Sequence, residues 1–221
     1  MAAPAIDPDT ALLGYIDKTG KFVIEPKFAD GRFFAKNGLA VVRDSATSLY
    51  GFIDKTGAYV IDPIYTGAMD FADNGLALAQ DKASGLVGFI DATGAFVIQP
   101  LYANASTFSG DLAIVKTADT GLVGFIDKTG KFLIDPTFKN ANNFDESGLA
   151  IVQDTDKERI GYIDKTGKYV IDSQFSDASA FENGLAFAKD VKSGLYGYID
   201  KTGNFVIDAT FSDASFFIQV G

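Results

Sequence analysis

The side chains of this sequence that could do chemistry are carboxylates, amines, phenols and hydroxyls. Its 221 residues include 29 Asp and Glu, 19 Lys and Arg and nine Tyr, but no His, no Cys and no Trp. Without imidazole or thiol groups, the chain cannot form a Ser-His pair, a thiolate nucleophile or a zinc site of the usual nitrogen and sulfur type. Carboxylate, lysine or tyrosine chemistry and oxygen-liganded cations remain.

Two acidic patterns are candidates for such chemistry. Asp154, Asp156 and Glu158 have the alternate spacing of calcium loops, but they lack the downstream Gly and bidentate Glu of an EF-hand. Six further Asp residues open a recurring Asp-Lys-Thr-Gly or Asp-Ala-Thr-Gly phrase: Asp17, Asp54, Asp91, Asp127, Asp164 and Asp200. Their regular recurrence indicates turns rather than one active site, and no carboxylate pair stands out for glycoside hydrolysis. We therefore expect no enzyme activity, no metal site and no cofactor.

The charge balance limits the partners. The formal net charge is −10, and the three Arg residues, Arg32, Arg43 and Arg159, form no basic run. We therefore expect no nucleic-acid binding. The longest apolar stretches have four or five residues, so no membrane span is expected.

The acidic phrase belongs to a repeat that fills most of the chain. Spacings of 37, 37, 36, 37 and 36 residues separate its opening glycines: Gly14, Gly51, Gly88, Gly124, Gly161 and Gly197. Periods of this length indicate propellers, solenoids or related arrays. We divide the chain into an N-terminal segment, residues 1–13, and a single repeat domain of six tandem repeats of about 37 residues, residues 14–221.

Each repeat predicts a three-stranded antiparallel meander, and the fold is expected to be all-β. The strands of one meander are exemplified by residues 39–42, 51–54 and 58–61. Asp in the phrase can accept a backbone bond, and its Gly supplies the left-handed conformation of a type I turn with a bulge. These turn glycines are Gly20, Gly57, Gly94, Gly130, Gly167 and Gly203.

Three further expectations follow from the pattern. Pro26, Pro63, Pro100 and Pro136 should end the third strand of their meanders. The first and third strands are apolar on both faces, which predicts sheets that are covered on both sides. Phe and Tyr recur in four columns at the repeat period, which predicts a core that neighbouring repeats build together.

The array could be a closed, β-propeller-like ring or an open, β-solenoid-like superhelix. The hairpin at Gly14 is expected to lack its first strand. If Phe217–Val220 supplies that strand, the ring closes and its sheet edges disappear, which favours the closed array.

The repeated phrase Gly-Tyr-Ile-Asp-Lys-Thr-Gly-Lys-Phe-Val-Ile-Asp/Glu-Pro, with the later Phe and Gly-Leu-Ala, resembles the WG-repeat (KWG) family of bacterial proteins. The resemblance covers residues 14–217. It departs at the residue before the opening Gly, Trp in the family, which is here Leu13, Tyr50, Val87, Val123, Ile160 and Tyr196. The resemblance implies a repeat scaffold, often secreted or associated with the envelope, with no common activity, cofactor or catalytic residue.

In a repeat scaffold, specific function is expected where the repeats differ. Arg and exposed aromatic residues are enriched in interfaces, so the predicted interaction surface consists of Arg32, Phe33, Arg43, Tyr50, Arg159 and Tyr196. We predict a non-catalytic module that binds another protein, in a periplasmic, cell-surface or secreted setting rather than the cytoplasm. The alternative is a multivalent carbohydrate- or cell-wall-binding module with a glycan ligand.

Overall fold

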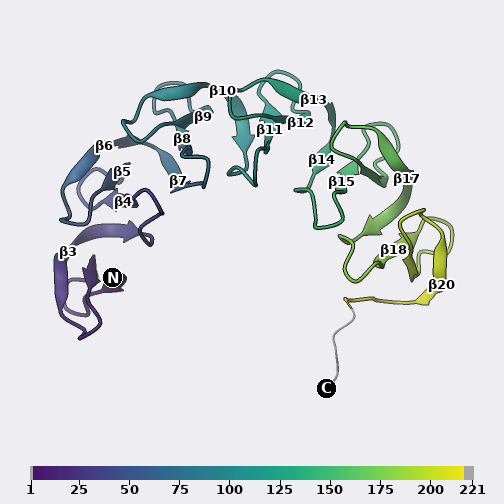
Figure 1. Ribbon diagram of the computed structural model, residues 1–221, viewed down its shortest axis with the longest axis horizontal. Helices are drawn as coiled ribbons and strands as arrows, with labels where there is room; N and C mark the ends of the chain where they lie inside the picture. The colour runs from purple at the N-terminus through teal and green to yellow at the C-terminus, as the bar shows by residue number, and fades with distance from the viewer. Residues whose placement is uncertain (1, 217–221) are drawn as a thin grey trace. The chain divides into compact units, whose positions relative to one another are not determined.

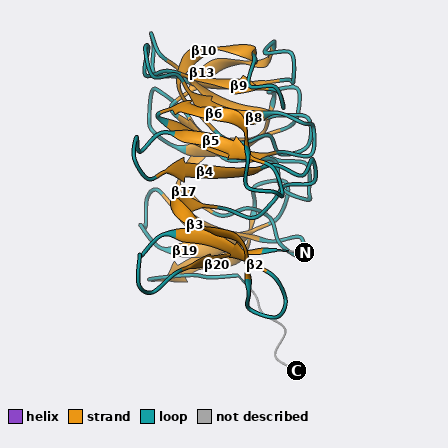
Figure 2. Cartoon of the chain, turned by 90° about the vertical axis from the view of Figure 1, so that its left-hand side faces the viewer, coloured by secondary structure: helices purple, strands orange, loops and turns teal. Residues whose placement is uncertain are grey.

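The computed structural model describes residues 2–216, and every regular element in this range is a strand (Figures 1 and 2). The first sheet contains β1 (Ala3–Ile6), β2 (Leu13–Ile16), β3 (Phe22–Gly31), β4 (Ala40–Asp44), β5 (Tyr50–Ile53) and β6 (Tyr59–Tyr65). The second contains β7 (Gly67–Phe71), β8 (Ala77–Gln80), β9 (Val87–Ile90), β10 (Phe96–Ala105), β11 (Ala113–Thr117), β12 (Val123–Ile126) and β13 (Phe132–Phe138). The third contains β14 (Asn140–Ala141), β15 (Ala150–Gln153), β16 (Ile160–Ile163), β17 (Tyr169–Ala178), β18 (Ala186–Asp190), β19 (Tyr196–Ile199) and β20 (Phe205–Phe211).

The predicted all-β fold of tandem antiparallel meanders is confirmed. We number the meanders one to six: β1–β3, β4–β7, β8–β10, β11–β14, β15–β17 and β18–β20. The chain divides into two compact units, residues 1–113 with 127–130, and residues 114–126 with 131–221.

The hairpin between the second and third strands follows from its turn sequence. In meander two, Oδ1 of Asp54 accepts bonds from the N–H of Thr56 (2.8 Å) and of Ala58 (3.2 Å). Gly57 closes the turn with a φ of 84°, in the region that only glycine adopts without strain. The acidic residue therefore holds the backbone of its own turn.

A bulge in the third strand explains both the opening glycine and the proline. Phe52 lies opposite Ile61 and Tyr50 lies opposite Tyr65, so one residue of β5 faces three residues of β6. A Cβ on Gly51 would lie 2.6 Å from the backbone oxygen of Ile61. The prediction that proline ends the strand is wrong, because Pro63 lies inside β6, within this bulge, where the ladder needs no N–H.

The third strand of a meander is shared with the next meander. The first part of β3 pairs with β2, and its last part pairs with β4, with Gly31 opposite Val42. In meanders two and four, this strand is interrupted by one residue, but the N–H of Thr66 still donates to the oxygen of Gln80 (3.1 Å). Neighbouring meanders within a compact unit are thus joined by hydrogen bonds as well as by side-chain packing.

The prediction that the sheets are covered on both sides holds for the first strand of meander two and is wrong for the third strand. Leu39–Val42 are all buried. In the third strand, however, the aliphatic residue after the first aromatic is about half exposed in every meander: Val23, Val60, Val97, Leu133, Val170 and Val206. Only the alternate residues of that strand, such as Ile24 and Phe28, face the core, as in a sheet with one solvated face.

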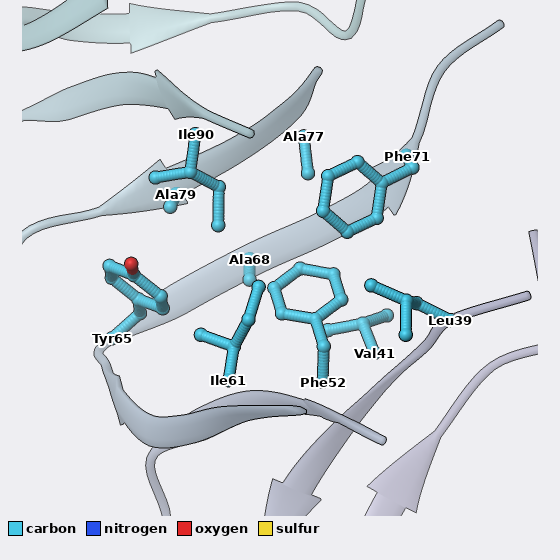
Figure 3. Close-up of a cluster of buried hydrophobic side chains, with 10 residues drawn as sticks. All are labelled: Leu39, Val41, Phe52, Ile61, Tyr65, Ala68, Phe71, Ala77, Ala79 and Ile90. Carbon is cyan, nitrogen blue, oxygen red and sulfur yellow. The ribbon is translucent and has the colours of Figure 1, made fainter. Parts of the chain in front are cut away.

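The aromatic columns form the core, as predicted. In the cluster of Figure 3, Phe52 is fully buried with its ring centroid 4.9 Å from that of Phe71. Tyr65 packs edge-on against Phe96 of the following meander at 5.9 Å, and its hydroxyl donates to the oxygen of Gly94 (2.7 Å). The cluster combines side chains of meanders two and three, so a single meander does not complete its own core.

The prediction that the first hairpin lacks a first strand is wrong. Ala3–Ile6 form β1 and pair with β2 in the register that β4 uses with β5. The loop that follows also repeats the later ones, since the N–H of Ala11 donates to the oxygen of Asp7 as that of Ser48 does to Asp44. The strand predicted to close a ring, Phe217–Val220, lies outside the described residues, and β1 takes the place beside β2. Closure of the array stays a prediction.

Candidate functional site

A pocket of about 430 Å³ in the first compact unit contains two of the predicted interface residues, Arg32 and Tyr50. Its other polar lining residues are Asp30, Thr66, Gln80 and Asn104, and its apolar ones include Met69, Leu78, Val87 and Ala103. We call it the Arg32 pocket. Mixed polar and apolar lining is typical of ligand sites.

Both backbone polar groups of Arg32 are hydrogen-bonded. Its N–H donates to the oxygen of Val41 (3.1 Å), and its oxygen accepts a bond from the hydroxyl of buried Tyr15 (2.8 Å). The guanidinium is 54% exposed, and its Nη1 lies 3.6 Å from Oδ2 of Asp70. Because both groups are well exposed, this ion pair contributes little stability and leaves the guanidinium able to bind another group.

Two residues that neighbour pocket-lining residues carry buried polar atoms without partners. Nε of Arg43 and Oδ1 of Asp70 are buried and form no hydrogen bond within the described part of the chain. They belong to strands β4 and β7, which pack against each other. Burial raises the pKa of Asp70, and nearby Arg32 opposes this shift. Unpartnered buried polar atoms are uncommon in folded proteins, which makes this region a candidate binding site.

Tyr50 reaches the pocket because it precedes the opening glycine at the start of β5, opposite Arg43 and Tyr65. Val87 holds the same position in the next meander and lines the same pocket. Residues before two successive opening glycines therefore contribute to one site.

The other predicted interface residues lie elsewhere. Phe33 is 67% exposed and lines a separate pocket of about 560 Å³ with Val23 and Lys55. Arg159 and Tyr196 belong to the second unit. There, the hydroxyl of Tyr196 donates to Oδ2 of Asp177 (2.8 Å).

Asp70, Gln80 and Asn104 are among the polar residues of this region that were not predicted from the sequence. Asp70 could have been found with the rule that selected Arg32, because its equivalents in the other repeats are uncharged: Phe33, Thr107, Asn143, Ala180 and Phe216. Gln80 and Asn104 carry no comparable signal.

The acidic candidates serve the local backbone. Oδ1 of Asp154 accepts a bond from the N–H of Lys157 (2.8 Å), and Glu158 forms an ion pair with Lys139. In residues 2–216, no group of three or more acidic side chains is arranged to hold a metal ion.

The buried tyrosines act as hydrogen-bond donors. Burial is the largest cause that raises the pKa of Tyr15 and of Tyr162 above the ordinary tyrosine value, so both remain protonated at neutral pH. Their hydroxyls donate to the backbone oxygens of Arg32 and Ser179. These phenols hold the backbone directly after the third strand of their meanders and are poor candidates for a catalytic base.

The turn carboxylates should make stability depend on pH. The hydroxyl of Thr93 is the first cause that lowers the pKa of Asp91, and the same holds for its equivalents with their own Thr: Asp17, Asp54, Asp164 and Asp200. A carboxyl with a lowered folded-state pKa stabilises the fold above its unfolded value of 3.8, and this stability is lost as the pH falls below it. We expect the urea concentration at the unfolding midpoint to decrease as the pH is lowered from about 5 to about 3. The decrease should be less steep in a triple variant that carries Asp54→Asn, Asp91→Asn and Asp164→Asn.

The control for this measurement is Asp111→Asn. Asp111 is exposed, and no hydrogen bond to its carboxylate is found within residues 2–216. Equal pH slopes for the triple variant and the unchanged protein would show that the turn carboxylates are not the source of the dependence.

A second pocket, of about 570 Å³, lies in the second unit. It is lined by carboxylates, an amide and two aromatic rings, among other residues: Asp145, Glu146, Glu182, Asn183, Phe181 and Phe216. Oδ2 of Asp145 accepts a bond from the N–H of Phe181 (2.9 Å), so this acid also supports the backbone.

The six repeats match a known family of repeat sequences. The family model of the WG containing repeat matches residues 14–44, 50–82, 88–119, 124–157, 160–190 and 196–219. No curated protein gives a match. No helix within residues 2–216 could cross a membrane.

Three solved structures are similar at low identity. A protein of unknown function from Bacteroides caccae is 15% identical, with a TM-score of 0.33 over 89% of this chain and 88% of that one. A chain of a nidogen/laminin complex is 11% identical, with a TM-score of 0.41 over 93% and 90%. A catalytically inactive virginiamycin B lyase from Staphylococcus aureus with quinupristin is 13% identical, with a TM-score of 0.38 over 96% and 85%. Function therefore has to be argued from the chain's own residues.

Proposed function

Since the chain belongs to the WG containing repeat family, with six successive matching segments, we propose that it is a non-catalytic protein-binding module whose Arg32 pocket holds an extended segment of a partner protein. The repeats provide a β-scaffold, and the pocket lies where their sequences differ. The turn acids of the repeats are bonded to their own backbone, which supports a binding role over catalysis.

The observation that carries the proposal is the pair of buried, unpartnered atoms on residues that neighbour the pocket lining. Nε of Arg43 is a donor and Oδ1 of Asp70 is an acceptor. Their neighbours Tyr50 and Met69 line the pocket, Tyr50 across the ladder and Met69 along the chain. A peptide group carries one N–H donor and one carbonyl acceptor, the two kinds of partner that these atoms lack.

Arg32 and Tyr50 add the side-chain part of recognition. The guanidinium can bind a carboxylate or a backbone carbonyl through several N–H groups. Tyr50 and Leu78 offer apolar surface against which a partner side chain can pack. Arg and Tyr are enriched among the residues that contribute most to binding energy in protein interfaces.

The test is selection of peptides from a displayed random library on the purified protein, followed by titration calorimetry. We expect selected peptides to bind the unchanged protein and to lose at least about tenfold in affinity with Arg32→Ala or Tyr50→Ala. Arg159→Ala, in the second unit, is the matched control and should leave the affinity unchanged. A library that yields no binder, or binders indifferent to both pocket variants, contradicts the proposal.

The lining of the second pocket supports carbohydrate binding as a second candidate function. Carboxylate and amide groups beside phenylalanine rings are the side chains that bind sugar hydroxyls and pack on sugar rings. A glycan array decides between the two candidates. Signal that disappears in Glu146→Gln with Asn183→Ala, but persists in Arg32→Ala, would support the carbohydrate function.

A further inference from the structure

Rows of three residues cross the sheet at the junctions between meanders. A row begins in the last part of a third strand, continues into the first strand of the next meander and ends at the residue before the next opening glycine. In the second junction the row is Gly67, Gln80 and Val87, which lie opposite one another across β7, β8 and β9. Residues directly opposite in a ladder have side chains on the same face of the sheet. We call this set the Gly67 row.

The first position of the row lacks a side chain in meander two. It is Asp or Asn in the other five meanders: Asp30, Asn104, Asn140, Asp177 and Asp213. In the row of Asp177, the hydroxyl of Tyr196 at the last position donates to Oδ2 of this Asp (2.8 Å). Gly67 therefore leaves open a place that a carboxylate or carboxamide side chain fills in the other repeats.

The row that shares a central glutamine shows which group fits this place. It consists of Asn140, Gln153 and Ile160. Nδ2 of Asn140 donates to Oε1 of Gln153 (2.7 Å), and Nε2 of Gln153 donates to the backbone oxygen of Glu158 (2.9 Å). A glutamine at the centre of a row thus takes a carboxamide as its partner.

Gln80 is held in the same way but has space where that carboxamide would lie. Its Nε2 donates to the backbone oxygen of Gly85 (2.8 Å), the equivalent of Glu158. Its Oε1 accepts a bond from the hydroxyl of Thr66 (3.1 Å) and, because an amide oxygen has two lone pairs, can accept a second. Among the described residues other than its chain neighbours, a Cβ on Gly67 would meet only Gln80 within 4 Å, with Oε1 the nearest atom at 3.3 Å. The space beside Oε1 can therefore take a ligand group.

The Arg32 pocket includes this space. All three residues of the Gly67 row line it, together with Asp30 and Asn104 of the neighbouring meanders. The lining holds one acid, Asp30, and one base, Arg32, which offset each other for a charged ligand. A carboxylate, moreover, has no proton to donate to Oε1 of Gln80. The lining thus favours a neutral group that carries an N–H donor.

We propose that the partner segment inserts the side-chain carboxamide of an Asn or Gln beside Gly67, where its N–H group donates to Oε1 of Gln80. The partner then completes the Gly67 row as Asn140 completes its own. This inference rests on the proposed peptide-binding function of the Arg32 pocket and names the group that the pocket selects.

Oriented peptide pools test which group is selected. Four pools of short synthetic peptides carry Asn, Gln, Asp or Leu at a fixed central position, and random residues other than Asn and Gln elsewhere. Each pool is passed over the immobilised protein, and the retained fraction is measured. We expect the Asn pool, the Gln pool or both to be retained at least about fivefold more than the Asp and Leu pools. Equal retention of all four pools, or strongest retention of the Asp or Leu pool, would overturn the inference.

Gly67→Asn supplies the missing carboxamide from the chain itself. Gly67 has no positive φ, and Asn140 occupies the same register in its own row, so the fold should tolerate the change. The preference for the Asn pool over the Asp pool should then fall below about twofold. Gly75→Asn is the matched control, because it places the same side chain in a loop outside the pocket lining, at a positive φ that Asn tolerates. A preference that survives Gly67→Asn overturns the inference.

Two readouts complete the test. The urea midpoint of Gly67→Asn should be no lower than that of Gly67→Ala, and a clearly lower midpoint would mean that the space does not fit a carboxamide. Pools that are retained equally by the unchanged protein and lost with Arg32→Ala would leave peptide binding in place and overturn only the choice of the carboxamide. If no pool is retained, both the inference and the proposed function are contradicted.

Discussion

Replacement of Gly88 by Ala is expected to lower the free energy of unfolding by about 3 kcal/mol. A Cβ at this position would lie 2.4 Å from the backbone oxygen of Ile98 and 2.8 Å from the nitrogen of Pro100. Neither atom can move without opening the bulge that sets the register between β9 and β10. Urea unfolding followed by tyrosine fluorescence measures the loss, because the chain has no Trp.

Gly67→Ala is the matched control for this substitution. Gly67 also lies in a strand without a positive φ, but its added Cβ would meet only side-chain atoms of Gln80, at 3.3 Å and beyond. We expect a change below about 1 kcal/mol. If both variants lose the same stability, the close backbone approach at Gly88 is not what requires glycine there.

Phe52→Ala should be similarly damaging, with a loss of about 3–5 kcal/mol. Phe52 is fully buried, contacts Phe71 and lies in the cluster of Figure 3, which two meanders build together. Its removal leaves a cavity that the surrounding strands cannot fill, because their register is set by the ladder. Equilibrium unfolding in urea again provides the measurement.

Phe33→Ala is the control for the Phe52 variant. Phe33 is 67% exposed, so its truncation should change the unfolding free energy by less than about 0.5 kcal/mol. A loss at Phe33 comparable with that at Phe52 would mean that this surface is covered in solution.

The repeat period made most of the fold predictable. Turn glycines such as Gly57 and buried aromatics such as Phe52 follow from local chemistry that recurs six times. Val23 was harder to place, because an apolar residue in a strand can be either core or exposed surface, and only the pairing decides. Pro63 was misplaced because a bulge depends on the partner strand.

The candidate site was less predictable than the fold. Arg32 and Tyr50 are 18 positions apart, and the sequence marks each as irregular without indicating that they share a pocket. β1 was missed because Ala-Pro-Ala-Ile does not resemble Leu-Ala-Val-Val. At this edge, position in the ladder determines the strand, and the side chains are free to differ.

The shared third strand has a consequence for how the chain should unfold. A meander cannot melt without removing hydrogen bonds from its neighbour, because one strand serves both. The coupling between adjacent meanders therefore includes backbone bonds as well as the packing of side chains. In nearest-neighbour descriptions of repeat proteins, a large interface contribution suppresses partly folded states. Loss of one internal meander should thus propagate through its compact unit, and unfolding of that unit should be more cooperative than the small size of each repeat suggests.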